Sequence, residues 1–363
     1  MSRTLTPHRP RERARTRPRG SFALRLFGER LSLLVRPRTL VVAAVLTALS
    51  AAALTVSVAV GDYEIPLGAV PAAIWGYGER LDVFFVQGVR LPRALTAIGV
   101  GAALGLAGAV FQSLSRNPLG SPDIIGFTGG AATGAVTVIL LFGAGRLGVS
   151  LGAIAGGMLT AAAVYLLSTK NGVQGYRLVL VGIGMAAMLG AVRDYLLTRA
   201  ELTDALSAQI WMIGSLNGRG WAEVAAVWIC LALLGPVLLA LGQRLRFMEL
   251  GEDTARGLGV PTRSTQLIAL AAASALTGAA IAVSGPIGFV ALAAPQLARR
   301  LMRTGGTTLA GSALMGAALL AVADLVALRA LAPTQLPVGV VTAVIGGSYL
   351  IWLLYTEWRG GRA

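Results

Sequence analysis

The chain has 363 residues, of which 55% are hydrophobic and only 13% are charged, with 31 basic residues against 16 acidic ones. A soluble domain carries about 25% charged residues, so this composition argues against a soluble enzyme. Cys230, His8 and Lys170 are each the only residue of their kind, and Asn171 follows the lysine, which excludes an intrachain disulfide, a His/Cys zinc site, a Ser-His-Asp triad and a P-loop.

The first 38 residues form a basic tail. They hold eleven arginines against two acids, Glu12 and Glu29. Charges of one sign at this density repel one another and bury little, so we expect residues 1–38 to be largely disordered. Such a run could bind nucleic acid, but a basic tail beside an apolar span more often holds that end in the cytoplasm. We therefore expect no nucleic-acid partner and an uncleaved first span.

Apolar stretches long enough to cross a bilayer fill the rest of the chain. Ten are predicted, at 39–60, 91–114, 124–143, 148–168, 177–198, 221–241, 265–285, 287–302, 308–328 and 337–356. Only helices and closed barrels satisfy the backbone in lipid, and these stretches are continuous rather than alternating, which favours helices. The sequence predicts an all-α integral membrane protein, with one transmembrane domain over 39–358 surrounded by membrane lipid.

The distribution of basic residues predicts the topology. With the N-terminus placed inside, the cytoplasmic side holds 23 Arg and Lys and the outer side 7. An excess of this kind marks the cytoplasmic side. An even number of spans then puts both termini in the cytoplasm.

Glycines recur at spacing four in three stretches. They are Gly101 and Gly105; Gly126, Gly130 and Gly134; and Gly152 and Gly156. Faces of small residues let membrane helices approach closely, so a tight bundle is one interpretation. A chain rich in Gly and Ala for compositional reasons is the other.

The loop 242–264 holds a short amphipathic segment. Glu252 and Asp253 suit the first turn of a helix, and Gly259 followed by Pro261 suits its end. Leu250, Ala255 and Leu258 would give a small apolar face, which a soluble partner could bind. A structured turn without a partner explains the same residues equally well.

Several motifs together resemble a known family. They are VRLPR at 89–93, GAALG at 101–105, FQSLSRNPLGSPD at 111–123, LGEDTA at 250–255, GPIGFV at 285–290, AD at 323–324 and QLPVGVVT at 335–342. In this order and spacing the chain resembles the iron-siderophore and vitamin B12 permeases of ABC importers, from about residue 40 to the C-terminus. GSLNG at 214–218 and the run 117–126 resemble the enterobactin-type siderophore branch.

The resemblance implies a type II importer permease with ten transmembrane helices in the cytoplasmic (inner) membrane. Such a subunit is not an enzyme and carries no cofactor; it moves its substrate, here a ferric siderophore of enterobactin type, by alternating access. The implied partners are a cytoplasmic ABC ATPase dimer, a second permease subunit, more readily a paralogue than a second copy, and an external siderophore-binding protein, either a lipoprotein or a periplasmic protein.

The resemblance also implies site residues. Segment 249–260 becomes the coupling helix, which contacts the ATPase through Leu250, Gly251, Glu252, Asp253, Ala255, Leu258 and Gly259. Outer-face arginines of the family dock the binding protein, and Arg90, Arg93 and Arg329 stand at or near those positions. Simple snorkelling of Arg90 and Arg93 to the membrane interface is the alternative.

Two further sets follow from the same resemblance. The cytoplasmic gate would use Asn117 and Leu119 in one turn and Gln174 and Gly175 in another, although Asn117-Pro118 is also an ordinary turn signal. Gly182, Met185 and Met188 would line the pathway, unless they serve only packing. Gln296 stands where family members often have histidine, so the resemblance assigns it no role.

Three rival functions remain. A vitamin B12 or haem importer would use the same machinery. A secondary transporter would need coupling-ion ligands or inverted repeats, and neither is found in the sequence. A membrane enzyme would need a set of catalytic residues. The single histidine and the lack of paired acids argue against such a set.

Overall fold

The computed structural model describes residues 22–26, 31–61, 63–123, 126–143, 145–168, 175–332 and 334–360. In chain order the elements are β1 (Phe22–Leu26), β2 (Leu31–Val35), α1 (Pro37–Ala59), α2 (Val70–Ile74), α3 (Arg80–Val83), η1 (Phe84–Arg90), α4 (Leu91–Ser115), α5 (Phe127–Phe142), α6 (Arg146–Ser168), α7 (Gly175–Arg199), α8 (Leu202–Ile213), α9 (Trp221–Glu249), α10 (Glu252–Gly257), α11 (Thr262–Ser284), α12 (Val290–Met302), α13 (Leu309–Arg329) and α14 (Val338–Gly360).

Each of the ten predicted apolar stretches overlaps one of these helices, and α8 lies between two of the stretches. Among the described residues, seven helices are long and apolar enough to cross a membrane, and the shorter apolar helices are α5 and the Val338–Trp352 part of α14. Helix α12 has 13 residues, which span about 20 Å at 1.5 Å per residue. It is short because the preceding segment cannot be helical: Gly285 and Phe289 have φ of 71° and 67°, and Pro286 lies between them.

The basic tail contains one regular feature that the sequence did not predict. Strands β1 and β2 pair antiparallel, with Phe22 opposite Val35 and Leu26 opposite Leu31. Residues 1–21 lie outside the described part of the chain, so the expected disorder there is not addressed by the structure.

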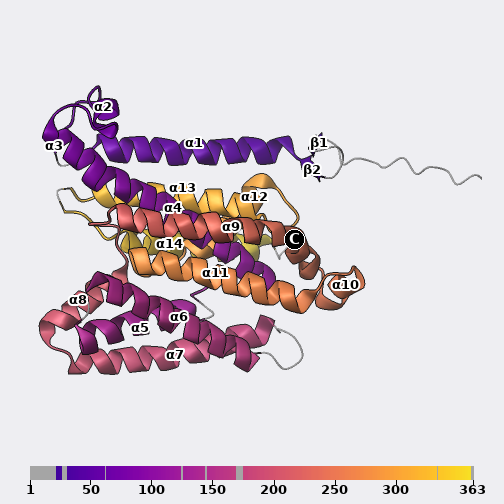
Figure 1. Cartoon of the computed structure of the whole chain (residues 1–363). Coiled ribbons are helices and arrows are strands. Elements are labelled where there is room, and N and C mark those ends of the chain that lie inside the picture. The colour runs from indigo at the N-terminus through magenta and orange to yellow at the C-terminus, as the bar shows by residue number, and fades with distance from the viewer. Residues whose placement is uncertain are drawn as a thin grey trace, which may run out of the picture.

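Helix α4 lies at the centre of the bundle (Figure 1). It continues α3 and the π-helical segment η1 into one apolar helix, Arg80–Ser115, whose most apolar stretch is 83% buried. Helices α9, α11, α12 and α13 surround it, and α5 to α8 form a second group beside α11 (Figure 1). We call the end that carries β1, β2 and α10 the α10 end, and the end that carries α2, α3 and α8 the α8 end.

The glycine spacing brings two pairs of helices into close contact, as the packing interpretation predicts. A Cβ added to Gly101 of α4 would lie 2.3 Å from the carbonyl oxygen of Gly316 in α13. A Cβ added to Gly134 of α5 would lie 2.1 Å from the carbonyl oxygen of Gly152 in α6. Backbone oxygens cannot yield as side chains can, so these positions require glycine.

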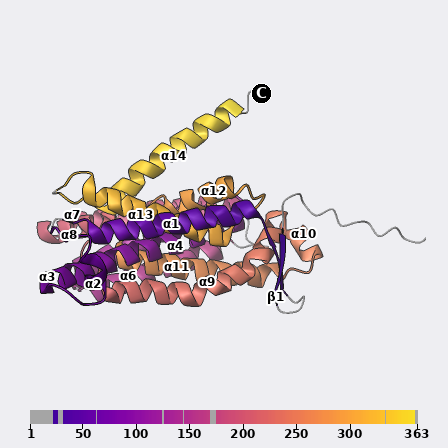
Figure 2. The same ribbon diagram turned by 90° about the horizontal axis from the view of Figure 1, so that it is seen from above.

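Two helices expose much of their apolar surface. In α7 only 11% of the most apolar stretch is buried, and Leu180, Ile183 and Val192 are exposed. Helix α14 projects away from the rest of the bundle (Figure 2), and it exposes Val344 and Ile351. Side chains of this kind avoid water, so lipid or another subunit must cover both helices.

Candidate docking, gate and coupling sites

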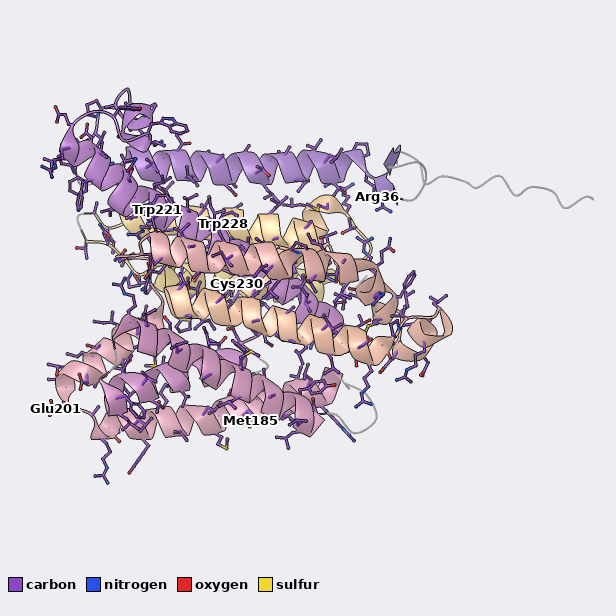
Figure 3. All side chains as sticks on the ribbon, in the orientation of Figure 1. Arg36, Met185, Glu201, Trp221, Trp228 and Cys230 are labelled. Atoms are coloured by element: carbon purple, nitrogen blue, oxygen red, sulfur yellow. The ribbon has the colours of Figure 1, made fainter. Side chains whose placement is uncertain are left out.

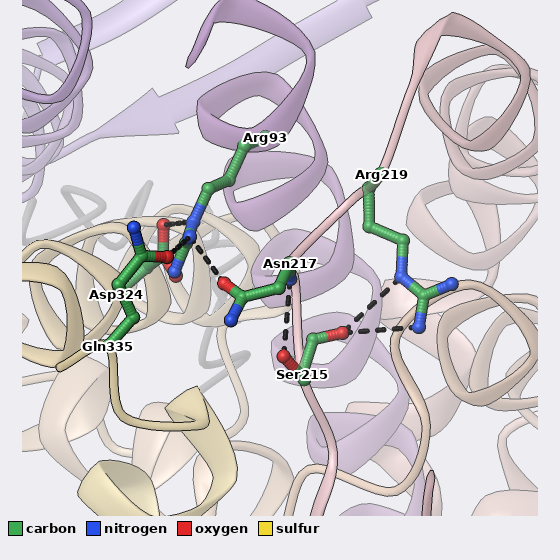
Figure 4. Close-up of polar contacts among 6 residues, drawn as sticks. All are labelled: Arg93, Ser215, Asn217, Arg219, Asp324 and Gln335. Atoms are coloured by element: carbon green, nitrogen blue, oxygen red, sulfur yellow. Dashed lines mark hydrogen bonds and ion pairs between the residues drawn. The ribbon is translucent and has the colours of Figure 1, made fainter. Parts of the chain in front are cut away.

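A buried ion pair lies near the α8 end (Figure 4). Arg93 at the start of α4 donates from Nε to Asp324 Oδ2 (3.0 Å) and from Nη2 to Asp324 Oδ1 (2.9 Å). The two side chains are 9% and 2% exposed. Nη1 of Arg93 donates to Asn217 and, at 3.1 Å, to Gln335 Oε1. One guanidinium thus joins α4, α13 and the loops that precede α9 and α14.

The Arg90 side chain also makes hydrogen bonds within the chain. Its guanidinium donates to the carbonyl oxygens of Val58 (3.0 Å), Ala59 (3.3 Å) and Tyr63. The first two are carbonyls at the end of α1, where a cation is favoured. Gly61 makes the approach possible, because a Cβ there would lie 2.0 Å from Arg90 Nη2. The residues Arg90 and Arg93 are each 8% exposed.

Both arginines, together with the half-buried Arg329, line a cavity of about 170 Å³ with Tyr63, Asn217 and Gln335. The three predicted docking residues therefore meet in one place. The sequence motifs do not by themselves pair Arg93 with Asp324. An acid inside the apolar stretch 308–328 was the available signal, because a charge in the membrane requires a partner.

The loop 214–220 beside this cavity is held by side-chain contacts (Figure 4). The Arg219 guanidinium donates to the carbonyl oxygen of Ser215 from Nε (3.4 Å) and Nη2 (3.3 Å). Burial lowers the pKa of Arg219, the charge of Arg146 lowers it further, and Glu223 raises it. Arg146 forms an ion pair with Glu223 at 3.1 Å and also donates to the Gly218 carbonyl oxygen of this loop at 3.3 Å.

At the α10 end, α4 is followed by a tight turn over residues 116–120, which we call the gate turn. The Leu119 amide donates to Asn117 Oδ1 (2.9 Å), and the Gly120 amide donates to the Asn117 carbonyl oxygen (2.9 Å). Leu119 is 41% exposed. Of the second predicted turn, Gln174 lies outside the described residues, and Gly175 is the first residue of α7.

Hydrogen bonds connect α12 and Phe289, the residue before it, to the gate turn and to Asp123, which follows that turn. Gln296 Nε2 donates to the carbonyl oxygen of Pro118, and Gln296 Oε1 accepts from Arg299 Nη2 at 3.0 Å. The Asp123 carboxylate accepts from the Thr128 hydroxyl (2.6 Å) and from the backbone N–H of Phe289. Desolvation raises the pKa of Asp123, and these two hydrogen bonds lower it by less. The role of Gln296 was open in the sequence, and here it contacts the gate turn.

The predicted pathway residues lie along α7 in different surroundings. Gly182 is buried, Met185 packs partly against the core, and Met188 is 55% exposed. Figure 3 labels Met185 on α7. Farther along α7, Arg193 Nε lies 3.5 Å from Asp194 Oδ1, so these neighbouring charges face each other.

A six-residue helix, α10, lies within the predicted coupling segment. Gly251 and Gly259 flank it with φ of 116° and 80°. Ala255 is fully buried against the core, whereas Leu250 and Leu258 are 66% and 58% exposed. Arg256 pairs with Glu252 (2.7 Å) and with Asp253 (3.4 Å) on the surface. Of the predicted contact residues, Ala255 anchors α10, and the two leucines form its exposed apolar surface.

Among the described residues, no group of three or more His, Cys, Asp or Glu could hold a metal ion.

Comparison with protein families gives a match over most of the chain. Residues 40–356 match the FecCD transport family. The chain is 46% identical over 301 residues to the ferric enterobactin transport system permease protein FepG of Escherichia coli (strain K12), covering 82% of this chain and 91% of FepG. It is 40% identical over 319 residues to the probable siderophore transport system permease protein YfhA of Bacillus subtilis (strain 168), covering 86% and 93%.

A vitamin B12 import system permease protein, BtuC of Serratia proteamaculans (strain 568), is 38% identical over 315 residues, covering 83% of this chain and 91% of BtuC. Among solved structures, an inward-facing conformation of a metal-chelate type ABC transporter superposes with a TM-score of 0.76 and 30% identity, covering 87% of this chain and 99% of that one.

Proposed function

The chain belongs to the FecCD transport family, and on this premise we propose that it imports a ferric siderophore of enterobactin type as the permease subunit of an ABC importer. It is a multi-pass protein of the cytoplasmic membrane with the helical fold of type II importer permeases, and it is not an enzyme. The observation that carries the substrate proposal is the 46% identity to FepG across nearly the whole of both chains.

We place the α10 end in the cytoplasm and assign ten membrane crossings. Arg146 is the first residue of α6 and Arg329 the last residue of α13, and both helix ends lie at the α8 end, which the predicted topology puts outside. The excess of basic residues on the opposite side supports this orientation. Both termini are then cytoplasmic, and α12, although short, is the eighth crossing.

The proposed partners follow from this orientation. An ABC ATPase dimer would contact α10 on the cytoplasmic side, and an external siderophore-binding protein would dock at the α8 end. A second permease subunit, for which we favour a paralogue, would cover α7. ATP binding would close the ATPases and move α10, so that the pathway beside α7 opens to one side and then to the other.

The cavity at the α8 end supports a docking role, within limits set by the contacts of each arginine. All three arginines line this cavity, so we assign the electrostatic part of docking to the cavity as a whole and test it at Arg329. Exposed ion pairs contribute about 0–1 kcal/mol each. Reversing Arg329 to Glu should therefore weaken binding-protein association by about fivefold at low salt, and less at high salt. An affinity that does not change at low salt would contradict this role.

Import into proteoliposomes tests the substrate. The permease would be reconstituted with its ATPase, its second permease and its binding protein, and radiolabelled ferric enterobactin would be offered with ATP. We expect ATP-dependent accumulation that excess unlabelled ferric enterobactin abolishes and excess vitamin B12 or haem does not. Competition by vitamin B12 or haem would instead support the alternative substrates. Accumulation driven by an ion gradient without ATP would contradict the ABC mechanism.

A further inference from the structure

Helix α12 and the loop that follows it are connected by side chains to two parts of the α10 end that the proposed mechanism must move together. One connection leads to the gate turn and the other to the end of α9, three residues before α10. We infer that α12 transmits the movement of α10 to the gate turn, with Gln296 and Thr307 as the positioning residues. This inference deepens the proposed function and rests on it for the roles of α10 and the gate turn.

The first connection consists of buried glutamines. Gln296, 7% exposed, donates to the Pro118 carbonyl oxygen, and its own oxygen is held by Arg299 from the next turn of α12. Gln112, 5% exposed, donates from the last part of α4 to the Leu292 carbonyl oxygen at 2.9 Å. Buried hydrogen bonds of this kind are costly to break, so the gate turn and α12 should move as one body.

The second connection lies in the loop that joins α12 to α13. The Thr307 hydroxyl donates to Glu249 Oε1 at the end of α9, and Arg246 Nε donates to the Thr307 carbonyl oxygen at 3.2 Å. Thr307 is 6% exposed. Gly306 allows this approach, because a Cβ there would lie 3.0 Å from Glu249 Oε2. The loop is itself tied back to α12, since the Thr304 amide donates to the Arg299 carbonyl oxygen (3.3 Å).

Two residues, Leu250 and Gly251, join α9 to α10, and both are hydrogen-bonded to the last turn of α9. The amides of Leu250 and Gly251 donate to the carbonyl oxygens of Phe247 (3.2 Å) and Met248 (3.1 Å). A displacement of α10 therefore reaches Glu249, then Thr307, then α12 and finally Pro118. Spatial continuity alone does not establish energetic coupling, so the test measures the response of the gate turn to ATP.

The test uses a single cysteine in this chain, within the importer assembled from partner subunits whose own cysteines have been replaced. Cys230→Ala removes the only native thiol, and Leu119→Cys places one on the exposed gate turn. The rate at which a water-soluble maleimide labels this introduced thiol is measured with and without ATP plus vanadate, and ATP hydrolysis is measured in parallel. Gln296→Glu removes the donor to Pro118 with little change in shape. Thr307→Val removes the hydroxyl at nearly constant volume.

Both variants should keep hydrolysing ATP while the ATP-dependent change in labelling of the gate-turn thiol is lost. Thr307→Ser, which keeps the hydroxyl, and Gln266→Glu, at a buried glutamine of α11 outside this path, should respond as the parent does. In Gln296→Glu, hydrogen exchange of residues 116–120 should also accelerate about tenfold, the factor for about 1.4 kcal/mol of lost hydrogen bonding.

The outcomes separate this inference from the function on which it rests. An ATP response that survives in both Gln296→Glu and Thr307→Val overturns the role of α12, while the importer function stands. A parent complex that hydrolyses ATP without any change in labelling of the gate-turn thiol overturns the gate assignment and the role of α12 together. If Gln296→Glu does not assemble, Thr307→Val decides the question with Thr307→Ser as its control.

Discussion

Individual charged residues of this chain are neutralised by partners distant in sequence. Arg93 and Asp324 are separated by 231 positions, yet they form a bidentate pair that is almost fully buried. An unpaired charge in the membrane interior is expensive, which explains why Asn217 and Gln335 complete the hydrogen bonding of the same guanidinium. These contacts stabilise the fold. If Arg93 also docks a binding protein, it must do so while its pair with Asp324 stays intact.

Removing one member of the pair should destabilise the protein strongly. Asp324→Asn leaves the Arg93 charge without its counterion, and breaking a buried ion pair costs about 3–5 kcal/mol. Thermal unfolding of the purified subunit in detergent measures the effect. The double variant Arg93→Met with Asp324→Leu should recover most of the loss, since it leaves no buried charge. A double variant as unstable as the single one would contradict this account.

Glycine contacts give a second prediction at the residue level. Gly101→Val places a side chain against the backbone of α13, where a Cβ would already lie 2.3 Å from the Gly316 oxygen. Overpacking of this kind costs about 1–3 kcal/mol, and thermal unfolding should show it. Gly235→Ala in α9 is the matched control, because its nearest neighbour would be 4.0 Å away. We expect the control to be neutral or slightly stabilised; an equal loss in both would contradict the close-contact explanation.

The helices to which we assign functional roles, α10 and α12, are short. Helix α12 begins after a non-helical segment, and α5 begins at Phe127, directly after Gly126 with φ of 84°. Helix α10 has only six residues, and Ala255 fixes it to the core while Leu250 and Leu258 face outward. A helix this short has little stability of its own, so its packing contacts determine where it lies.

The exposed leucines of α10 should matter only in the assembled importer. Leu258→Ala should leave the fold intact and reduce binding of the ATPase by about tenfold or more, because truncating a leucine buried at an interface costs about 2–5 kcal/mol. Co-purification of the ATPase with the permease gives the measurement. Leu233→Ala, on α9 and 67% exposed, is the control that should change nothing. Undiminished ATPase binding by Leu258→Ala would contradict the coupling role of α10.

On the scale of the whole molecule, α7 and α14 leave large apolar surfaces without a partner in a single chain. If a second permease covers α7, Met188→Cys in a Cys230→Ala background, labelled with a benzophenone maleimide, should photocrosslink to that subunit in the intact complex. Masses of the crosslinked products distinguish a paralogue, which gives a heterodimer, from a second copy. Leu233→Cys, at an exposed position of α9, is the control. Failure of the Met188→Cys variant to crosslink in the intact complex would place the subunit interface elsewhere.

The apolar stretches predicted where the membrane helices lie, because lipid requires every backbone group to be bonded within its own segment. Seven of the described helices are long enough to cross a membrane, against ten predicted. The glycine spacing likewise predicted close helix contacts, and α4 with α13 and α5 with α6 confirm them. The motifs of the 250–255 and 285–290 segments identified the family before any geometry was known, since their order along the chain is specific.

Only the tertiary structure decided which of these residues meet. The pairing of Arg93 with Asp324, the hold of Arg90 on the end of α1, and the contact of Gln296 with Pro118 join positions 32 to 231 residues apart. Helical periodicity relates residues within a span, but it does not state which spans are neighbours. Which spans are neighbours depends on the packing of the whole bundle. This packing places Arg93, which was expected at the outer surface, in a buried ion pair with Asp324.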